Sequence, residues 1–499
     1  MKKIFAIFGT SLVAQIVALI YGLVLPRLIL EQYGSELNGL MQSITQFLGI
    51  ISFLEMGIGQ VVQSALYKPL VERDHITISR VVGSASRFYR RISYVLLGYI
   101  AVLIFAYPLI VSYSFDWKFI ATLIIIMGLG MFAQYYFGIV NEQLLHADQK
   151  SYLIYGLQIG TNLVSLLVCV VMIRLGCSIH ALKFATILVF LGKPLIYLIF
   201  VRKHYRIDRK ITYVEEPIKQ KWDGVAQHIA SVVLSSTDNI VLTIFSTLHD
   251  VSIYSVYHMV VANIQRFYYT ATIGVQSAAG RIWVEQDFRK IKNFYDIVEF
   301  ILHAVTIFLF CCTGILIVPF VHVYTNGLTD ANYIQPSFAY IIVIAYGIFC
   351  LRTPYNIWIL AAGHFKQTRR CHIIAASINL LISIFVVARW GLIGVAIGTL
   401  VAMCYQTVWM AVYTMRNLVK CKVKDVVKRC VADCVMVALI IGCTRWITLS
   451  QVSYLGWIVM AFKVASIALG CIVVTSSVFY WPQCIHLMKM KRGKTADKI

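Results

Sequence analysis

Charged side chains are scarce in this chain of 499 residues. Asp, Glu, Lys and Arg together make up 13% of it, whereas a soluble domain carries about 25%. Hydrophobic residues make up 60%, and the mean hydropathy is +0.78. Apolar runs of about 20 residues recur along the whole length, which suits membrane-spanning helices, because barrel strands alternate in polarity and are about half as long. The composition predicts an all-α polytopic membrane protein and excludes a soluble domain.

The chain also lacks the motifs that carry catalysis or bind metals. Its 13 cysteines are scattered along apolar runs with no CxxC and no Cys/His ligand spacing, so we expect small buried side chains rather than disulfides or a metal site. No Ser/His/Asp constellation and no phosphate-cradling loop is present. The apolar stretch 4–25 is too long for a signal peptide and has no cleavage site, so it is predicted to be the first span. We predict a protein that is not an enzyme and needs no cofactor.

The formal net charge of +22 does not indicate nucleic-acid binding. The basic residues lie in short segments between apolar runs, where the rules of membrane orientation place them. With the N-terminus inside, 34 of the 44 Lys and Arg residues fall in inside segments and six fall in outside segments. This bias predicts that both termini are cytoplasmic.

We predict fourteen membrane spans from the apolar runs. The second is interrupted around Glu55, Gly57 and Gly59, and the eleventh is short. Their expected ranges are 4–26, 37–66, 88–111, 119–145, 151–173, 180–201, 223–246, 252–278, 297–320, 335–360, 371–388, 392–414, 430–448 and 455–480.

Two parts of the sequence share short identical or similar segments, which form an echo at a nearly constant offset. Val-Gln-Ser-Ala occurs at 62–65 and again at 275–278, and each copy is followed by a Glu-x-Asp triplet, at 72–74 and 285–287. These positions are all offset by 213 residues. A second pair agrees: Asn162 with Asn379, and 174–176 with 389–391, at offsets of 217 and 215. Because six spans separate the copies, both halves enter the membrane from the same side, which predicts a parallel repeat.

This repeat sets the expected domain organisation. We expect an N-terminal six-helix lobe at 1–203, a C-terminal six-helix lobe at 223–415, and two further helices with a basic cytoplasmic tail at 416–499. Residues 204–222 are predicted to be a basic cytoplasmic linker. It could bind anionic lipid headgroups, although its charge is also what any inside loop would carry.

Polar residues within the spans are the candidates for a site, because a charge in lipid normally faces protein or a water-filled cavity. Asp238 and Arg266 lie in neighbouring apolar runs, and Arg352 lies in a third. An interhelical ion pair is the simpler explanation for these three. Arg27 could line a cavity or extend to the interface. The full candidate set is Arg27, Glu55, Gln60, Gln63, Glu142, Asp238, Asn239, Asn263, Arg266, Gln276, Arg352 and Asn356.

The arginines bear on the sign of the substrate. Arginine is permanently charged and matches phosphate in a bidentate geometry. An anionic, phosphate-bearing substrate is therefore a better match than a cationic drug. We predict Arg27, Arg266, Arg352, Asn239 and Gln276 as substrate-binding residues.

The chain resembles a family of transporters. The stretches that carry the resemblance are Tyr-Gly-Ser-Glu-Leu-Asn-Gly-Leu at 33–40, Glu-Met-Gly-Ile-Gly at 55–59, Thr-Asp-Asn-Ile-Val-Leu at 237–242 and Val-Ser-Ile-Tyr-Ser at 251–255. Together with the span pattern they resemble the multidrug/oligosaccharidyl-lipid/polysaccharide (MOP) exporter superfamily, and within it the bacterial O-antigen and capsule repeat-unit flippases.

The resemblance implies a fold of two lobes, similar to MATE transporters and lipid II flippases, that alternates between inward-open and outward-open states. The implied cargo is a polyprenyl-pyrophosphate-linked oligosaccharide carried across the cytoplasmic membrane for O-antigen, capsule or exopolysaccharide assembly. Arg266 and Arg352 would meet the pyrophosphate, and Asp238 and Glu55 would pair with them or couple to protons or sodium. Membrane lipids, a polysaccharide polymerase and glycosyltransferases would be the partners.

Two other functions stay open at this point. A cation-coupled multidrug antiporter of the same superfamily would prefer a negatively charged cavity, whereas Arg27, Arg266 and Arg352 against Glu55 and Asp238 give +1. A membrane polysaccharide polymerase or ligase would need an extramembrane face for its chemistry. The longest predicted outside loop, 321–334, argues against that enzyme.

Overall fold

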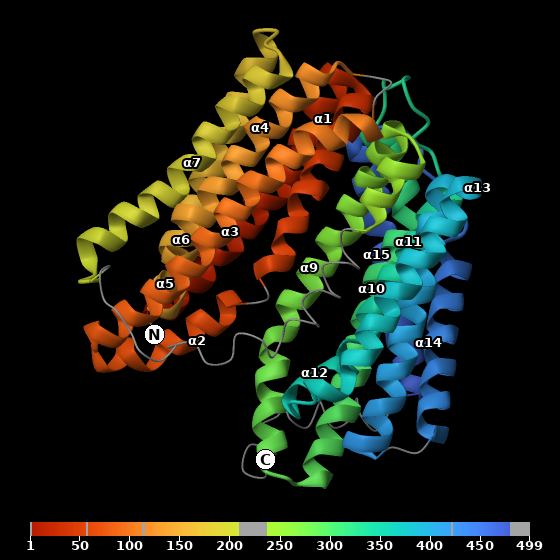
Figure 1. The fold of residues 1–499 in the computed structure, drawn as a ribbon. Coiled ribbons are helices and arrows are strands. Elements are labelled where there is room, and N and C mark those ends of the chain that lie inside the picture. The colour runs from red at the N-terminus through yellow and green to blue at the C-terminus, as the bar shows by residue number, and fades with distance from the viewer. Residues whose placement is uncertain (1, 56–57, 112–114, 209–236, 421–422, 480–499) are drawn as a thin grey trace. The chain divides into compact units, whose positions relative to one another are not determined.

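A computed structural model describes residues 2–55, 58–111, 115–208, 237–420 and 423–479. Every regular element in these ranges is helical, which confirms the predicted all-α fold. The chain divides into two compact units, Met1–Ser252 and Ile253–Ile499. Figure 1 shows the course of the helices, and each unit is described by itself.

The first unit is built from long helices that lie side by side (Figure 1). Helix α1 packs against α6, α6 and α4 pack against α7, and α3 packs against α4. Their shared interior is apolar and includes Leu40, Ile58, Leu96 and Leu144. The elements are α1 (Lys2–Gly49), η1 (Ile50–Glu55), α2 (Ile58–Glu72), α3 (His75–Ile110), α4 (Trp117–Ala133), η2 (Gln134–Gly138), α5 (Ile139–Ala147), α6 (Ser151–Arg174), α7 (Ile179–His204) and a helix at 237–245.

The second unit contains most of α9, whose first residues belong to the first unit. Helix α11 packs against α13, and α10 packs against α11, α14 and α15. Met436 and Val464 are among the residues that join α14 and α15 to α10 through a separate apolar cluster. The elements are α9 (Leu248–Val284), α10 (Phe288–Tyr324), α11 (Pro336–Leu351), α12 (Thr353–Ala361), α13 (Phe365–Thr414), η3 (Met415–Val419), α14 (Val423–Thr444) and α15 (Tyr454–Phe479).

In the part of the chain that the structure describes, each predicted span coincides with helical structure. Within the described ranges, nine helical segments are long and apolar enough to cross a membrane. Two of these segments extend over more than one predicted span, because the chain turns inside them at Gly34 (φ 83°) and at Gly391 (φ 50°). The first segment covers the second span only as far as Glu55, and the other holds the eleventh and twelfth spans. Helices α11 and α12 share the tenth span, and only 237–245 of the seventh is described. The predicted interruption of the second span is confirmed, because α1 gives way to the 3-10 turn η1 before α2 begins.

The two halves of the sequence turn in the same way. Residues with left-handed backbone occur at Arg73 and Gln286, and at Gly176 and Gly391, which are 213 and 215 residues apart. A third pair, at 149 and 363, is separated by 214 residues. L-residues adopt this conformation rarely, so its recurrence at matched positions confirms the internal repeat.

The helix caps repeat as well. Asp74 caps α3 and accepts hydrogen bonds from the backbone N–H groups of residues 76 and 77. Asp287 caps α10 through residues 289 and 290 in the same way. An N-cap carboxylate satisfies N–H groups that have no partner within the helix. The Glu-x-Asp echo in the sequence is therefore a repeated helix start.

The predicted linker 204–222 is described only as far as Asp208. Within that part, the Tyr205 hydroxyl donates to Asp148 Oδ2 at 2.5 Å and accepts from Lys150 Nζ at 3.0 Å. Farther along the chain, Thr243 in the helix at 237–245 donates to Ser43 at 2.7 Å. The compact units meet at Ser252, well beyond this linker, and the division into lobes at 1–203 and 223–415 stays a prediction.

Candidate functional site

Arg352 occupies the junction between α11 and α12, where Pro354 begins a new helix. Its side chain is only 7% exposed. One guanidinium nitrogen donates to Gln406 Oε1, and Gln406 Nε2 lies 2.9 Å from His372 Nδ1. The guanidinium carbon lies 3.9 Å from the centre of the Phe349 ring. The site is therefore a cation held by an amide and an aromatic face.

The charge on Arg352 has no ionic partner in the described part of the chain. No carboxylate there lies within 4.0 Å of its guanidinium, and its Nε is buried without a hydrogen-bond partner. Burying a charge without a counter-charge is costly. The interhelical ion pair that was the alternative explanation for Arg352 is not present among these residues, and the role of Arg352 in substrate binding stays a prediction.

Arg266 and Gln276 both lie on α9 with exposed side chains. Between the described residues, no contact joins Arg266 to Arg352. Two turns before Arg266, His258 Nε2 lies 2.8 Å from the Tyr346 hydroxyl, which links α9 to α11. Arg266 is thus an exposed cation on a helix that a polar contact joins to α11 within the second unit.

The remaining predicted residues lie in the first unit. Arg27 forms an ion pair with Glu31 at 2.6 Å, one turn along α1, so part of its charge is balanced locally. Glu55 accepts a hydrogen bond from the Tyr135 hydroxyl of η2. Asp238 and Asn239 are buried at 4% and 5% exposure. Whether any of these residues binds a substrate or couples an ion stays a prediction.

The π-helical turn η2 marks a polar region of the first unit. Gln134 begins the turn and donates to Glu142 at 3.4 Å, and Glu142 lies 4.0 Å from Lys193 of α7. π-Helical turns are frequent at functional sites. Glu142 was among the predicted candidates, whereas Lys193 was not predicted to be its partner.

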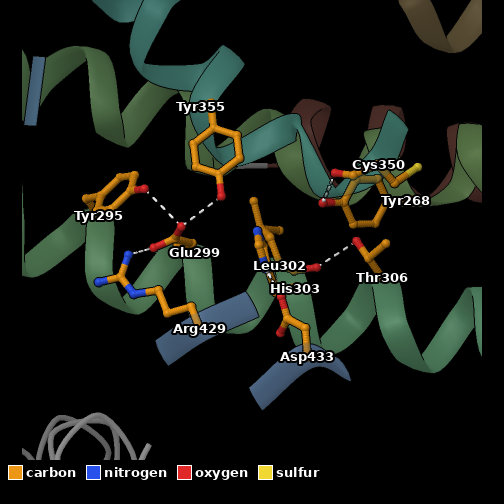
Figure 2. Close-up of polar contacts among 10 residues, drawn as sticks. All are labelled: Tyr268, Tyr295, Glu299, Leu302, His303, Thr306, Cys350, Tyr355, Arg429 and Asp433. Atoms are coloured by element: carbon orange, nitrogen blue, oxygen red, sulfur yellow. Dashed lines mark hydrogen bonds and ion pairs between the residues drawn. The ribbon is translucent and has the colours of Figure 1, made fainter. Parts of the chain in front are cut away.

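A second polar cluster escaped the sequence analysis altogether (Figure 2). It joins α10 to α14 and α12 and contains Glu299, His303, Arg429, Asp433 and Tyr355. Glu299 is 1% exposed, and His303 is 6% exposed. The charges recur at helical spacing, at 296, 299 and 303 on α10 and at 429 and 433 on α14. This spacing was the available signal, but the predicted span 430–448 begins one residue after Arg429 and leaves it outside the membrane.

The geometry of the cluster is tight. Arg429 forms ion pairs with Asp296 at 2.5 Å and with Glu299. Glu299 Oε1 also accepts from the hydroxyls of Tyr295 at 2.9 Å and Tyr355 at 3.0 Å. One turn farther along, His303 Nδ1 lies 2.7 Å from Asp433 Oδ2. Apart from Asp296, Figure 2 shows these side chains in the space between α10, α12 and α14.

Comparisons with known proteins identify the fold. No family model matches the sequence, and no curated protein matches it. Among solved structures, an inward-facing multidrug resistance MATE transporter of the MOP superfamily matches with a TM-score of 0.62 and 14% identity, over 80% of this chain and 94% of that one. A MOP superfamily transporter from Pyrococcus furiosus, described as having a binding pocket of reverse polarity, matches with a TM-score of 0.59 and 14% identity, over 83% and 96%. The chain therefore has the fold of MATE transporters of the MOP superfamily.

Proposed function

We propose that this protein is a transporter that moves a polyprenyl-pyrophosphate-linked oligosaccharide across the cytoplasmic membrane by alternating access. The observation that carries the proposal is Arg352, a buried guanidinium without a carboxylate partner among the described residues. A pyrophosphate group would supply the missing negative charge. Guanidinium groups bind phosphate oxygens through paired hydrogen bonds.

The surroundings of Arg352 support an anionic ligand over a cationic one. His372 is buried beside the same glutamine and could donate a further hydrogen bond. Arg266 adds an exposed cation on α9. A cationic drug would meet repulsion at Arg352, because no carboxylate there offsets the positive charge. The fold is shared with multidrug transporters, so the choice of cargo rests on this charge.

Genetic complementation tests the cargo. Cells that lack this protein would receive the wild type, Arg352→Ala, Arg266→Ala, or Arg416→Ala, which alters an exposed arginine of η3 as a matched control. We expect cells with Arg352→Ala or Arg266→Ala to lose surface polysaccharide, while the level of each variant in the membrane stays normal. The control should export normally.

The same strains distinguish the proposed function from multidrug export. If the protein exports cationic drugs, its loss should raise drug sensitivity without changing surface polysaccharide. Normal polysaccharide export by Arg352→Ala at normal membrane level would overturn the proposed role of this arginine.

A further inference from the structure

The cluster between α10 and α14 contains more acidic side chains than basic ones. Asp296, Glu299 and Asp433 are three carboxylates, and Arg429 is the only Lys or Arg within 4.0 Å of them in the described ranges. With His303 neutral, these groups sum to a net charge of −2. Such an excess in a mostly buried place favours the uptake of a cation.

His303 offers a place for that cation. Its Nδ1 faces the Asp433 carboxylate, which can only accept while ionised, so Nδ1 carries the hydrogen. The other ring nitrogen, Nε2, then holds a free lone pair. It is buried and has no hydrogen-bond partner among the described residues. The ring lies edge-on to Tyr355, with 6.1 Å between ring centres.

The other charged and polar groups near this pair already have ionic or hydrogen-bond partners. The Glu299 charge is matched by Arg429 and by two tyrosine hydroxyls. Asp296 is paired with the same arginine. From α9, the Tyr268 hydroxyl donates to the carbonyl of Cys350, and on α14 the Cys430 thiol lies near Asp433. His303 is therefore the group with an open site.

We propose that the His303–Asp433 pair is a proton-binding site. Its ligand is a single proton, which is taken from hydronium and forms one N–H bond at Nε2. The loaded site is an imidazolium–carboxylate ion pair, so proton binding strengthens the contact between α10 and α14. Helix α14 lies outside the predicted internal repeat, and the site thus joins the additional helices to the rest of the second unit in a pH-dependent way. This inference does not depend on the identity of the cargo.

Thermal unfolding of the purified full-length protein tests the proposal. A proton that binds the folded state more tightly than the unfolded state adds stability as the pH falls. The wild type should therefore gain stability between about pH 8 and about pH 6, the range in which histidines titrate. His303→Gln should lose this gain, because its amide can still donate to Asp433 but cannot bind a proton. His303→Lys, which carries a permanent charge, should be stabilised at both pH values.

Contributions from other histidines are removed by comparing variants. His75→Gln alters an exposed histidine at the start of α3, outside the cluster, and should keep the wild-type gain. If His303→Gln does not fold, Asp433→Asn provides the same test, because it removes the counter-charge. The proposal is overturned if His303→Gln, or Asp433→Asn in its place, keeps the full gain. It is also overturned if that variant loses stability equally at both pH values, which would indicate a hydrogen bond of structural importance alone.

Discussion

Asn38 and Ser252 are 214 residues apart and form a hydrogen bond, with Asn38 Nδ2 donating to Ser252 Oγ at 2.8 Å. Their separation falls within the offsets of 213 to 215 residues at which the turns repeat. The two residues therefore occupy equivalent positions in the two halves of the sequence. Both are at most 1% exposed. This contact ties the start of the predicted eighth span to the start of the second.

Close backbone packing beside this contact makes Gly39 sensitive to substitution. A Cβ at Gly39 would lie 1.9 Å from the carbonyl oxygen of Leu248. Gly39→Ala must therefore push α1 and the start of α9 apart, and overpacking of this kind costs about 1–3 kcal/mol. Gly49→Ala is the matched control, because nothing lies within 4 Å of its added methyl group. Thermal unfolding should show a loss for Gly39→Ala alone; equal stability of the two variants would contradict the close packing.

Substitution of Gly176 or Gly391 should destabilise the fold, because both residues have a backbone conformation that strains other residues. Both have left-handed φ values, 66° and 50°. Gly391→Ala and Gly176→Ala should each destabilise the fold by about 1–2 kcal/mol, since an L-residue is strained there. Gly442 lies within helix α14, and no atom lies within 4 Å of an added Cβ. Gly442→Ala should therefore be neutral or slightly stabilising, because glycine within a helix is less favourable than alanine. Chemical denaturation would measure all three, and an effect at Gly442 as large as at the turns would count against this account.

Removing Arg429 should be among the most destabilising single changes in the second unit. Arg429→Leu leaves Asp296 and Glu299 without their cation, and breaking a buried pair from one side costs about 3–5 kcal/mol. The double variant Arg429→Leu, Glu299→Leu should recover part of this loss. Arg416→Leu, at an exposed arginine, should change the stability little. A small effect of Arg429→Leu would show that the carboxylates are not held by this residue.

The cap at Asp74 makes a pH-dependent contribution. The side-chain and backbone hydrogen bonds from Thr77 lower the pKa of the Asp74 carboxyl below its ordinary value. A carboxyl with a lowered pKa adds stability above its unfolded-state pKa and loses it as the pH falls through the folded-state pKa. Wild type should therefore exceed Asp74→Ala in stability at neutral pH, and the difference should narrow in acid. A difference that grew as the pH fell would contradict the assignment.

Local sequence determined much of the fold. Apolar runs located the helices, and the Glu-x-Asp echo located two equivalent helix starts, because composition and capping act over a few residues. Pairing between helices was harder to predict. Asp433 meets His303 across 130 residues, and Lys193 meets Glu142 from another helix. The rotation of each helix about its axis sets these contacts, and tertiary packing sets that rotation.

The candidate site was predicted only in part, because its contacts between helices also depend on tertiary packing. Arg352 was found because a permanent charge within an apolar run is rare. Its partners Gln406 and His372 were not found, since they lie on α13 and neither is unusual in its own segment. Arg27 was expected to line a cavity or to extend to the interface, and its ion pair with Glu31, four residues away on α1, was not predicted.

Transport by the purified protein tests the central claim most directly. The protein would be reconstituted into liposomes that contain a fluorescent polyprenyl-pyrophosphate-linked oligosaccharide, and a quencher that does not cross the membrane would report movement between leaflets. The wild type should accelerate this movement over empty liposomes, and Arg352→Gln should slow it about 10- to 100-fold, as the loss of charged hydrogen bonds of about 1.5–3 kcal/mol implies. Arg352→Lys should fall between them, because lysine cannot bind phosphate through a fork of two donors. Equal rates for the wild type and Arg352→Gln, or no acceleration by the wild type, would contradict the account.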